Sequence, residues 1–276
     1  MTIQDGLKNN PFLKRCVLFT SLLVCSSSVF AFGDCTTAAC AAKVYKGQCN
    51  AGGYDCPPIR PHGIFAISGG YGYSHVGKSQ TIHSADTAYI YDADDSVQSQ
   101  PFGGFTIGGE FFFLGGYGID VGLAYYQSAA FKAEGTFTTK IDDVVSTPSN
   151  YKYSIIGRQA LIEFKFLTLD GSPYHPYITI GVGEAFNTSY SYDTYVAGTP
   201  MFKSALKHSF AFAGGAGLDV DVVKHIRLGA GYRYANFGDA NTGFGHFDGI
   251  KNSQTDALEV SNLNTQGWII QLTVIM

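Results

Sequence analysis

The sequence predicts an all-β protein, an eight-stranded antiparallel up-and-down transmembrane β-barrel. Three observations support this: eight segments with apolar residues at every second position, a second face made mostly of glycine and alanine, and connections that alternate between short and long. The composition agrees, because 34 Gly, 18 Tyr and 21 Phe stand beside only 14% charged residues. Such a composition favours strands and tight turns over helices.

The N-terminus reads as a signal peptide over residues 1–31. The basic residues Lys8, Lys14 and Arg15 precede a short apolar run, and small residues around Ala31 suit cleavage. The run is too short, and too rich in serine, for a retained membrane helix. We therefore expect an exported protein.

Residues 32–62 form a segment that contains the four cysteines left after cleavage. An even number of cysteines in an exported chain predicts two disulfides, with three possible pairings. A metal site with four thiolate ligands is the alternative, although the spacing is looser than that of paired CxxC motifs. The four residues are Cys35, Cys40, Cys49 and Cys56.

The barrel is predicted over residues 63–276, and its first three strands are 64–74, 104–112 and 117–126. Period-two alternation places successive side chains on opposite faces of a strand, so each segment has one apolar face. The apolar positions are Phe65, Ile67, Tyr71 and Tyr73; Phe105, Ile107 and Phe111; and Tyr117, Ile119, Val121, Leu123 and Tyr125.

The fourth to sixth strands are predicted over 153–167, 177–186 and 210–221. Two charges interrupt their apolar faces. Arg158 either snorkels at the membrane edge or marks a bulge, and the placement of Glu184 stays open. The apolar positions are Ala160, Ile162, Phe164 and Phe166; Ile178, Ile180, Val182 and Phe186; and Phe210, Phe212, Leu218 and Val220.

The last two strands are predicted in "KHIRLGAGYRYANFGD" (224–239) and "GWIIQLTVIM" (267–276). In the seventh, aromatic and aliphatic residues share one parity, while only glycine and arginine occupy the other. The apolar positions are Ile226, Leu228, Ala230, Tyr232 and Tyr234, then Trp268, Ile270, Leu272, Val274 and Met276.

The second face of these strands decides between a membrane barrel and a soluble sandwich, which shows the same alternation. A solvent-facing sheet carries long polar side chains and little glycine, whereas small residues suit the narrow lumen of eight strands. We expect its charges to form a packed salt-bridge network, with a selectivity filter or proton path as the alternative. These lumen residues are Glu110, Asp120, Glu163, Lys165, Asp219, Asp221, Arg227 and Arg233.

The connections after the odd-numbered strands are long: residues 76–101, 131–152, 190–207 and 238–263. Those after the second, fourth and sixth strands are short, which is the asymmetry of extracellular loops and periplasmic turns. Both termini are therefore expected in the periplasm. Tyrosines inside the long loops suit adhesive surfaces, and the candidates for binding are Tyr89, Tyr91 and Tyr195.

The segments "FGGFTIGGEFFF", "YGIDVGLAYY" and "RLGAGYRYANFGDA" resemble strands of the small outer-membrane barrels of the OmpA-type transmembrane domain and the Opa-like opacity surface proteins. The resemblance covers residues 63–276. It implies a Gram-negative outer-membrane barrel that is inserted by the barrel-insertion machinery and surrounded by outer-membrane lipid and lipopolysaccharide. The family is a scaffold with diverse loops, so the resemblance implies the architecture rather than an activity.

Enzymatic chemistry has little support in the sequence. His83–Ser84 and His208–Ser209 are the adjacent histidine–serine pairs, and no longer motif surrounds either of them. The run Asp92–Asp95 lacks the glycine and glutamate of an EF-hand. We expect no catalytic residues, no cofactor and no metal site in the barrel. Without a dense basic cluster, we also expect no nucleic-acid partner.

We therefore expect a monomeric, non-enzymatic surface protein with an envelope-structural role. Its long loops would bind a ligand on a host or another cell surface. The alternatives are a narrow pore or a conduit for small hydrophobic molecules, and third a lipid A-modifying enzyme.

Overall fold

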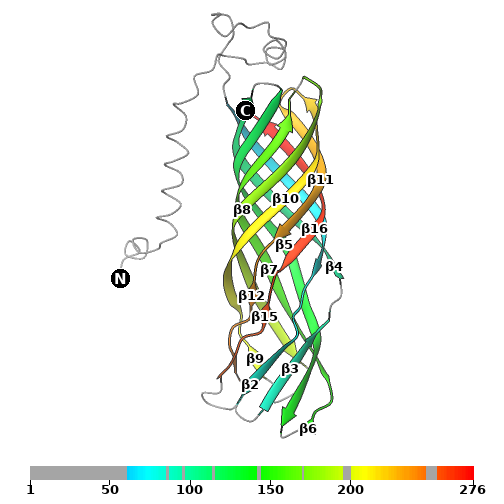
Figure 1. The fold of residues 1–276 in the computed structure, drawn as a ribbon, viewed down its shortest axis with the longest axis vertical. Helices are drawn as coiled ribbons and strands as arrows, with labels where there is room; N and C mark the ends of the chain where they lie inside the picture. The colour runs from blue at the N-terminus through cyan, green and yellow to red at the C-terminus, as the bar shows by residue number, and fades with distance from the viewer. Residues whose placement is uncertain are drawn as a thin grey trace, which may run out of the picture. The chain divides into compact units, whose positions relative to one another are not determined.

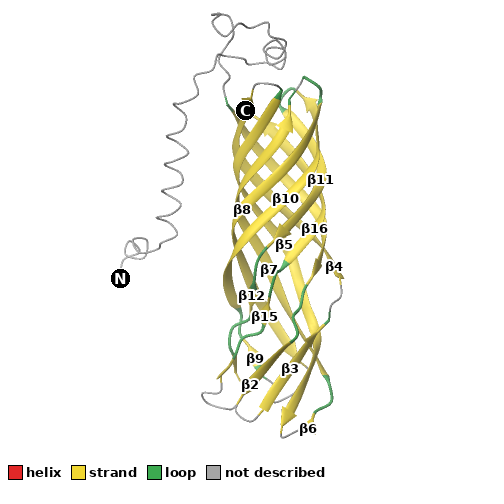
Figure 2. Cartoon of the chain, in the orientation of Figure 1, coloured by secondary structure: helices red, strands yellow, loops and turns green. Residues whose placement is uncertain are grey.

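The computed structural model describes residues 61–84, 87–94, 97–113, 116–141, 144–169, 171–194, 200–246 and 254–276. The signal peptide, the four cysteines and Tyr195 lie outside the described residues, and their predictions stay predictions. The described residues form strands and connections (Figure 2). Among them no helix is long and apolar enough to cross a membrane.

Eight strands close into one antiparallel ring in which each strand pairs with the next along the chain, and the last pairs with the first. The predicted eight-stranded up-and-down barrel is therefore confirmed. The ring consists of β1 (His62–His75), β4 (Val97–Phe113), β5 (Tyr117–Ile141), β7 (Ser149–Thr168), β8 (Tyr174–Thr194), β10 (Ala205–Val223), β11 (Ile226–Asn236) and β16 (Asn264–Ile275).

The strands are staggered around the ring. A row of paired residues that starts at Glu110 in β4 passes through every strand and returns to β4 at Gln100, ten residues away. Such a stagger requires strands tilted by roughly 35–45° from the barrel axis. All side chains of this row face the lumen, so the row climbs through the lumen as a spiral.

Beyond the ring's far end the chain builds an extension, which we define as the part of the barrel wall opposite the C-terminus together with its short strands (Figure 1). It includes the halves of β5, β7 and β8 that lie farther from the C-terminus. The short strands are β2 (Gln80–Ser84), β3 (Thr87–Ala93), β6 (Val144–Val145), β9 (Met201–Phe202), β12 (Ala240–Asn241), β13 (Gly245–His246), β14 (Gln254–Thr255) and β15 (Glu259–Val260).

The prediction of long loops was therefore wrong over much of 76–101, 131–152 and 190–207. Strand β5 continues to Ile141, and β7 begins at Ser149. Strand β3 of the hairpin β2–β3 pairs with residues 135–141 of β5. The continuation of these strands was not recognised in the sequence. The stretches alternate with the same period as the membrane strands, but they carry more polar residues.

The outside of the barrel changes character along each strand. Next to the C-terminal end, exposed apolar side chains such as Ile107, Leu123, Ile178 and Trp268 form a continuous band. In β5 the apolar outward positions run from Tyr117 to Tyr125, nine residues, which suits a band about 25 Å tall. This is the outside of a transmembrane barrel, with its polar residues turned inward.

A β-bulge in β5 reverses this polarity in the extension. Two residues, Ser128 and Ala129, stand opposite the single Gly157 of β7. The Ser128 hydroxyl accepts a hydrogen bond from the Gly157 N–H and donates one to its carbonyl, both at 3.2 Å. Beyond the bulge, Phe131 and residues of its parity point inward instead of outward.

Tyr89 and Tyr91 are not exposed loop residues, so their prediction as surface binding side chains was wrong. Both lie in β3 and are buried, Tyr91 completely. The Tyr91 ring packs against Phe137, Tyr151 and Phe202 at centroid distances of 5.2–6.0 Å. The extension has an aromatic core, and burying these rings stabilises it more than leaving them in water.

Candidate functional site

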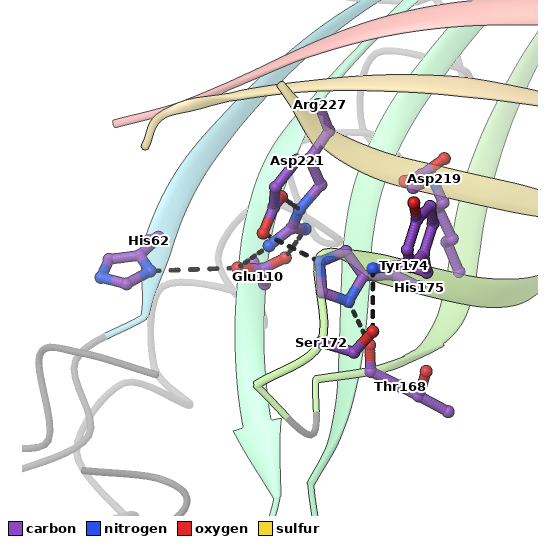
Figure 3. A network of polar contacts seen from close by, with 10 residues as sticks. His62, Glu110, Thr168, Ser172, Tyr174, His175, Asp219, Asp221 and Arg227 are labelled. Carbon is purple, nitrogen blue, oxygen red and sulfur yellow. Dashed lines mark hydrogen bonds and ion pairs between the residues drawn. The ribbon is translucent and has the colours of Figure 1, made fainter. Parts of the chain in front are cut away.

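The lumen next to the C-terminal end contains a network of charges centred on Arg227 of β11 (Figure 3). Its guanidinium binds both carboxylate oxygens of Glu110 and donates from Nε to Asp221 at 3.0 Å. Glu110 also lies 3.9 Å from Nδ1 of His62. Asp221 is at the mouth, where its side chain is 40% exposed, and the other members of the predicted set are buried.

His175 joins the same network from β8. Its Nδ1 lies 2.7 Å from the carbonyl oxygen of Thr168, and its Nε2 lies 2.9 Å from Asp221 (Figure 3). Both partners, a backbone carbonyl and a carboxylate, are hydrogen-bond acceptors. His62 and His175 were not predicted because they stand at the first and second positions of their strands, before the alternation is established. The inward parity of Tyr177 would have identified His175.

A second ion pair lies one step further into the lumen. Lys165 Nζ lies 2.5 Å from Asp219 and 3.1 Å from Gln271 Oε1, and it sits 4.2 Å from the centroid of the Tyr177 ring. Its partners belong to three other strands, so the ammonium connects β7 to β8, β10 and β16 across the lumen. Asp219 has room because Gly229 stands beside it: a Cβ there would collide with the Asp219 carboxylate.

Arg233 forms the third layer. Its guanidinium stacks on the Tyr126 ring at 3.8 Å and donates to Gln159 at 3.3 Å. The Tyr126 hydroxyl donates to Glu163 at 3.2 Å. Gln159 in turn donates to the carbonyl of Asn236 at 2.8 Å. Glu163 and Arg233, both predicted lumen residues, thus meet through the same tyrosine.

Asp120 stands apart from these pairs. It is paired across the strands with Glu110 and with Lys165, yet its buried Oδ1 has no hydrogen-bond partner among the described residues. The cavity beside it measures about 10 Å³, roughly the space of one water molecule. In this layer the side chains therefore leave a cavity for about one water molecule beside Asp120.

The aromatic core of the extension covers the far end of the lumen. Phe131, Tyr153, Ile155 and Phe237 are all buried, and Phe131 packs on Phe237 at a centroid distance of 5.7 Å. Burial, and the Asp92 carboxylate nearby, raise the pKa of Tyr151 to about 12. The Tyr151 ring is therefore neutral at pH 7 and adds no charge to this core.

An open cleft of about 550 Å³ lies on the extension, where β3, β5 and β7 run side by side. Asp92 is fixed by a 2.7 Å hydrogen bond from Ser79, and Lys152 pairs with Asp193 at 3.4 Å. The lining is mixed in charge and includes an aromatic ring. It consists of Asp92, Ala93, Asp94, Glu134, Gly135, Thr136, Asn150, Tyr151 and Lys152.

Arg158 and Glu184, whose places the sequence left open, both lie on the outer face where the apolar band ends. Arg158 stands next to the bulge and reaches away from the band, donating to Gln127 at 3.2 Å and to Thr188 at 3.5 Å. Glu184 accepts a 2.8 Å contact from His208 Nδ1. A bulge in the neighbouring strand β5 thus adjoins Arg158, while its snorkelling at a membrane edge stays a prediction.

The residues considered for catalysis do not assemble. His208 points outward with Phe210, whereas the Ser209 hydroxyl donates to the Asp239 carbonyl at 2.9 Å. His83 is exposed in β2, and the Ser84 side chain lies outside the described part. Of the acidic run, Asp92 and Asp94 line the cleft. Within the described ranges, no cluster of histidine, cysteine and acidic residues could hold a metal ion.

No family model matches the sequence, and no curated protein matches it. The solved structures to which the chain is similar include neisserial surface protein A, at 13% identity over 77% of this chain and 96% of that chain, with a TM-score of 0.36. They also include the outer membrane protein OprG from Pseudomonas aeruginosa, at 16% identity over 77% and 97%, with a TM-score of 0.41. The outer membrane protease OmpT from Escherichia coli is similar at 8% identity over 78% and 97%, with a TM-score of 0.46.

Proposed function

We propose that this chain is a non-enzymatic surface protein of a Gram-negative outer membrane. In this proposal the barrel anchors the protein in lipid, and the extension binds a ligand on a host or another cell surface. Both termini and the short turns face the periplasm, and the extension faces outward.

The observation that carries the proposal is that buried side chains fill the lumen at two levels. Ion pairs fill the lumen of the membrane part, and an aromatic core fills the interior of the extension. A barrel filled in this way offers little room for transport, so the surface that remains for function is that of the extension. Its long paired strands hold this surface rigid, which lowers the ordering cost of binding.

The cleft between β3, β5 and β7 is the binding site that we assign to this surface. It is concave, and it combines carboxylates, amide and hydroxyl groups with Lys152 and Tyr151. Such a mixture of a few polar groups with an aromatic ring is typical of recognition sites. It replaces Tyr89 and Tyr91 as the candidate for adhesion.

The test is adherence of bacteria that display the protein to a cultured epithelial monolayer. Thr136→Arg and Asn150→Arg place a long cation in the cleft, and we expect adherence to fall to that of cells with an empty vector. Ser261→Arg is the matched control, because it adds the same charge at an exposed position outside the cleft lining.

Heat-modifiable gel mobility, which separates folded from unfolded barrels, shows whether each variant is folded. Adherence of folded Thr136→Arg and Asn150→Arg at the wild-type level would contradict the assignment of the cleft.

A further inference from the structure

A row of four outer-face residues runs across β5, β7, β8 and β10 at the end of the apolar band: Gln127, Arg158, Phe186 and His208. Between the row and the C-terminal end of the barrel the outer positions are mostly apolar, as at Leu123, Ile162 and Val182. In a bilayer this level is where hydrocarbon gives way to lipid headgroups.

Arg158, the arginine of this row, lacks an anionic partner within the described ranges. No described carboxylate forms an ion pair with Arg158, whose hydrogen-bond partners are the neutral side chains of Gln127 and Thr188. Glu184, two residues before Phe186 in β8, lies 2.8 Å from Nδ1 of His208. The guanidinium is half-buried, so its charge needs a partner more than that of a fully exposed lysine does.

Both neutral partners accept from Arg158, which fixes their own orientation. The Gln127 carbonyl oxygen and the Thr188 hydroxyl oxygen face the guanidinium, so the Gln127 amide N–H₂ and the Thr188 O–H remain as donors. The three side chains thus offer donors on one lipid-facing patch. A guanidinium with flanking donors is the geometry that suits a phosphate.

We propose that Arg158, with Gln127 and Thr188, binds the phosphate of a lipid in the outer leaflet, as on lipid A. The inference rests on the proposed orientation, in which the extension faces outward and the row lies in the outer leaflet. It adds a lipid contact at the wall of the barrel, separate from the cleft on the extension.

The test is lipid retention by the refolded chain in native mass spectrometry, after release from micelles that contain lipid A. We expect one lipid A to be retained by the wild type, and about tenfold less to be retained after Arg158→Gln. Arg158→Lys should retain an intermediate amount, because an ammonium keeps the charge but loses the fork. Lipid A treated with phosphatase should be retained no better by the wild type than by Arg158→Gln.

Lys132→Gln is the matched control. Lys132 is an exposed cation of β5 that lies outside the cleft lining, and its removal changes the net charge equally. Equal retention by wild type and Arg158→Gln would overturn the lipid site, as would binding of inorganic phosphate alone with the strength of lipid A. Adherence measured on the same variants keeps the two proposals apart, because the cleft does not include Arg158.

Discussion

Single buried side chains in this lumen depend on partners from distant parts of the chain. Lys165 and Asp219 are 5% and 1% exposed, so neither can be hydrated if the other is removed. A buried charge without its partner costs several kcal/mol, whereas an exposed pair contributes little. The pair therefore matters most when one half of it is lost.

Lys165→Met should lower the free energy of unfolding by about 3–5 kcal/mol, because Asp219 stays buried without a cation. The double variant Lys165→Met/Asp219→Asn should recover most of that loss. Urea unfolding in vesicles measures it through the single tryptophan, Trp268, on the lipid-facing side.

Lys152→Met supplies the control, since Lys152 and Asp193 are about half exposed, at 49% and 50%. We expect a change of about 1 kcal/mol or less there. An equal loss in both single variants would show that the lumen pair is not the reason for the effect.

Among the strands, β5 and β7 reach the same reversal of polarity by different means. In β7 the apolar residues change parity: Tyr151 to Ile155 point inward on odd positions, and Ala160 to Phe166 point outward on even ones. In β5 the apolar residues keep odd positions, and the bulge at Ser128–Ala129 turns the backbone instead. Strand β8 uses a second irregularity near Ser191, whose φ is 54°, to turn Tyr192 toward the core.

Deleting Ala129 should therefore turn Phe131, Ala133 and Phe137 outward and bring Lys132 and Glu134 into the aromatic core. We expect the extension to lose its core while the membrane band still inserts. Limited trypsin digestion, which reports local opening, should cut after Lys132 and Lys140 at least about tenfold faster than in the wild type.

Ala129→Ser keeps the residue count and should be digested like the wild type. Resistance of the deletion variant to trypsin would mean that the bulge does not set the facing of β5.

The whole molecule combines two polarities in one continuous wall. Where lipid surrounds it, apolar side chains point out and ion pairs fill the lumen; in the extension, aromatic rings point in and charges point out. Buried side chains occupy the lumen at two levels, the pairs at Lys165 and Arg227 and the core around Phe131 and Tyr91.

We expect the refolded mature chain to insert into a planar bilayer without discrete conductance steps. Charge-neutralising substitutions at one layer, such as Arg233→Gln, should leave it silent because the aromatic core still covers the lumen. Ion-dependent steps from the wild type would contradict the closed lumen and move a narrow pore ahead of surface binding.

The amino-acid sequence was sufficient to predict the strands of the membrane part of this protein and the facing of their side chains. Lipid outside and a narrow lumen inside impose one rule on every strand, so alternation alone told the outward residues from the inward ones, and the eight lumen charges could be named. Which of these charges pair with one another could not be predicted. Lys165 and Asp219, like Arg227 and Glu110, meet through the register of strands that are far apart in the chain.

Only the tertiary structure decided which face of each strand in the extension is buried. Alternation divides a strand into two faces but does not say which one is buried, and one extra residue at a bulge exchanges them. Tyr91 has the surroundings of a loop tyrosine in the sequence, yet the pairing of β3 with β5 turns its ring into the core. Burial there follows from neighbours brought together by folding, which no local pattern records.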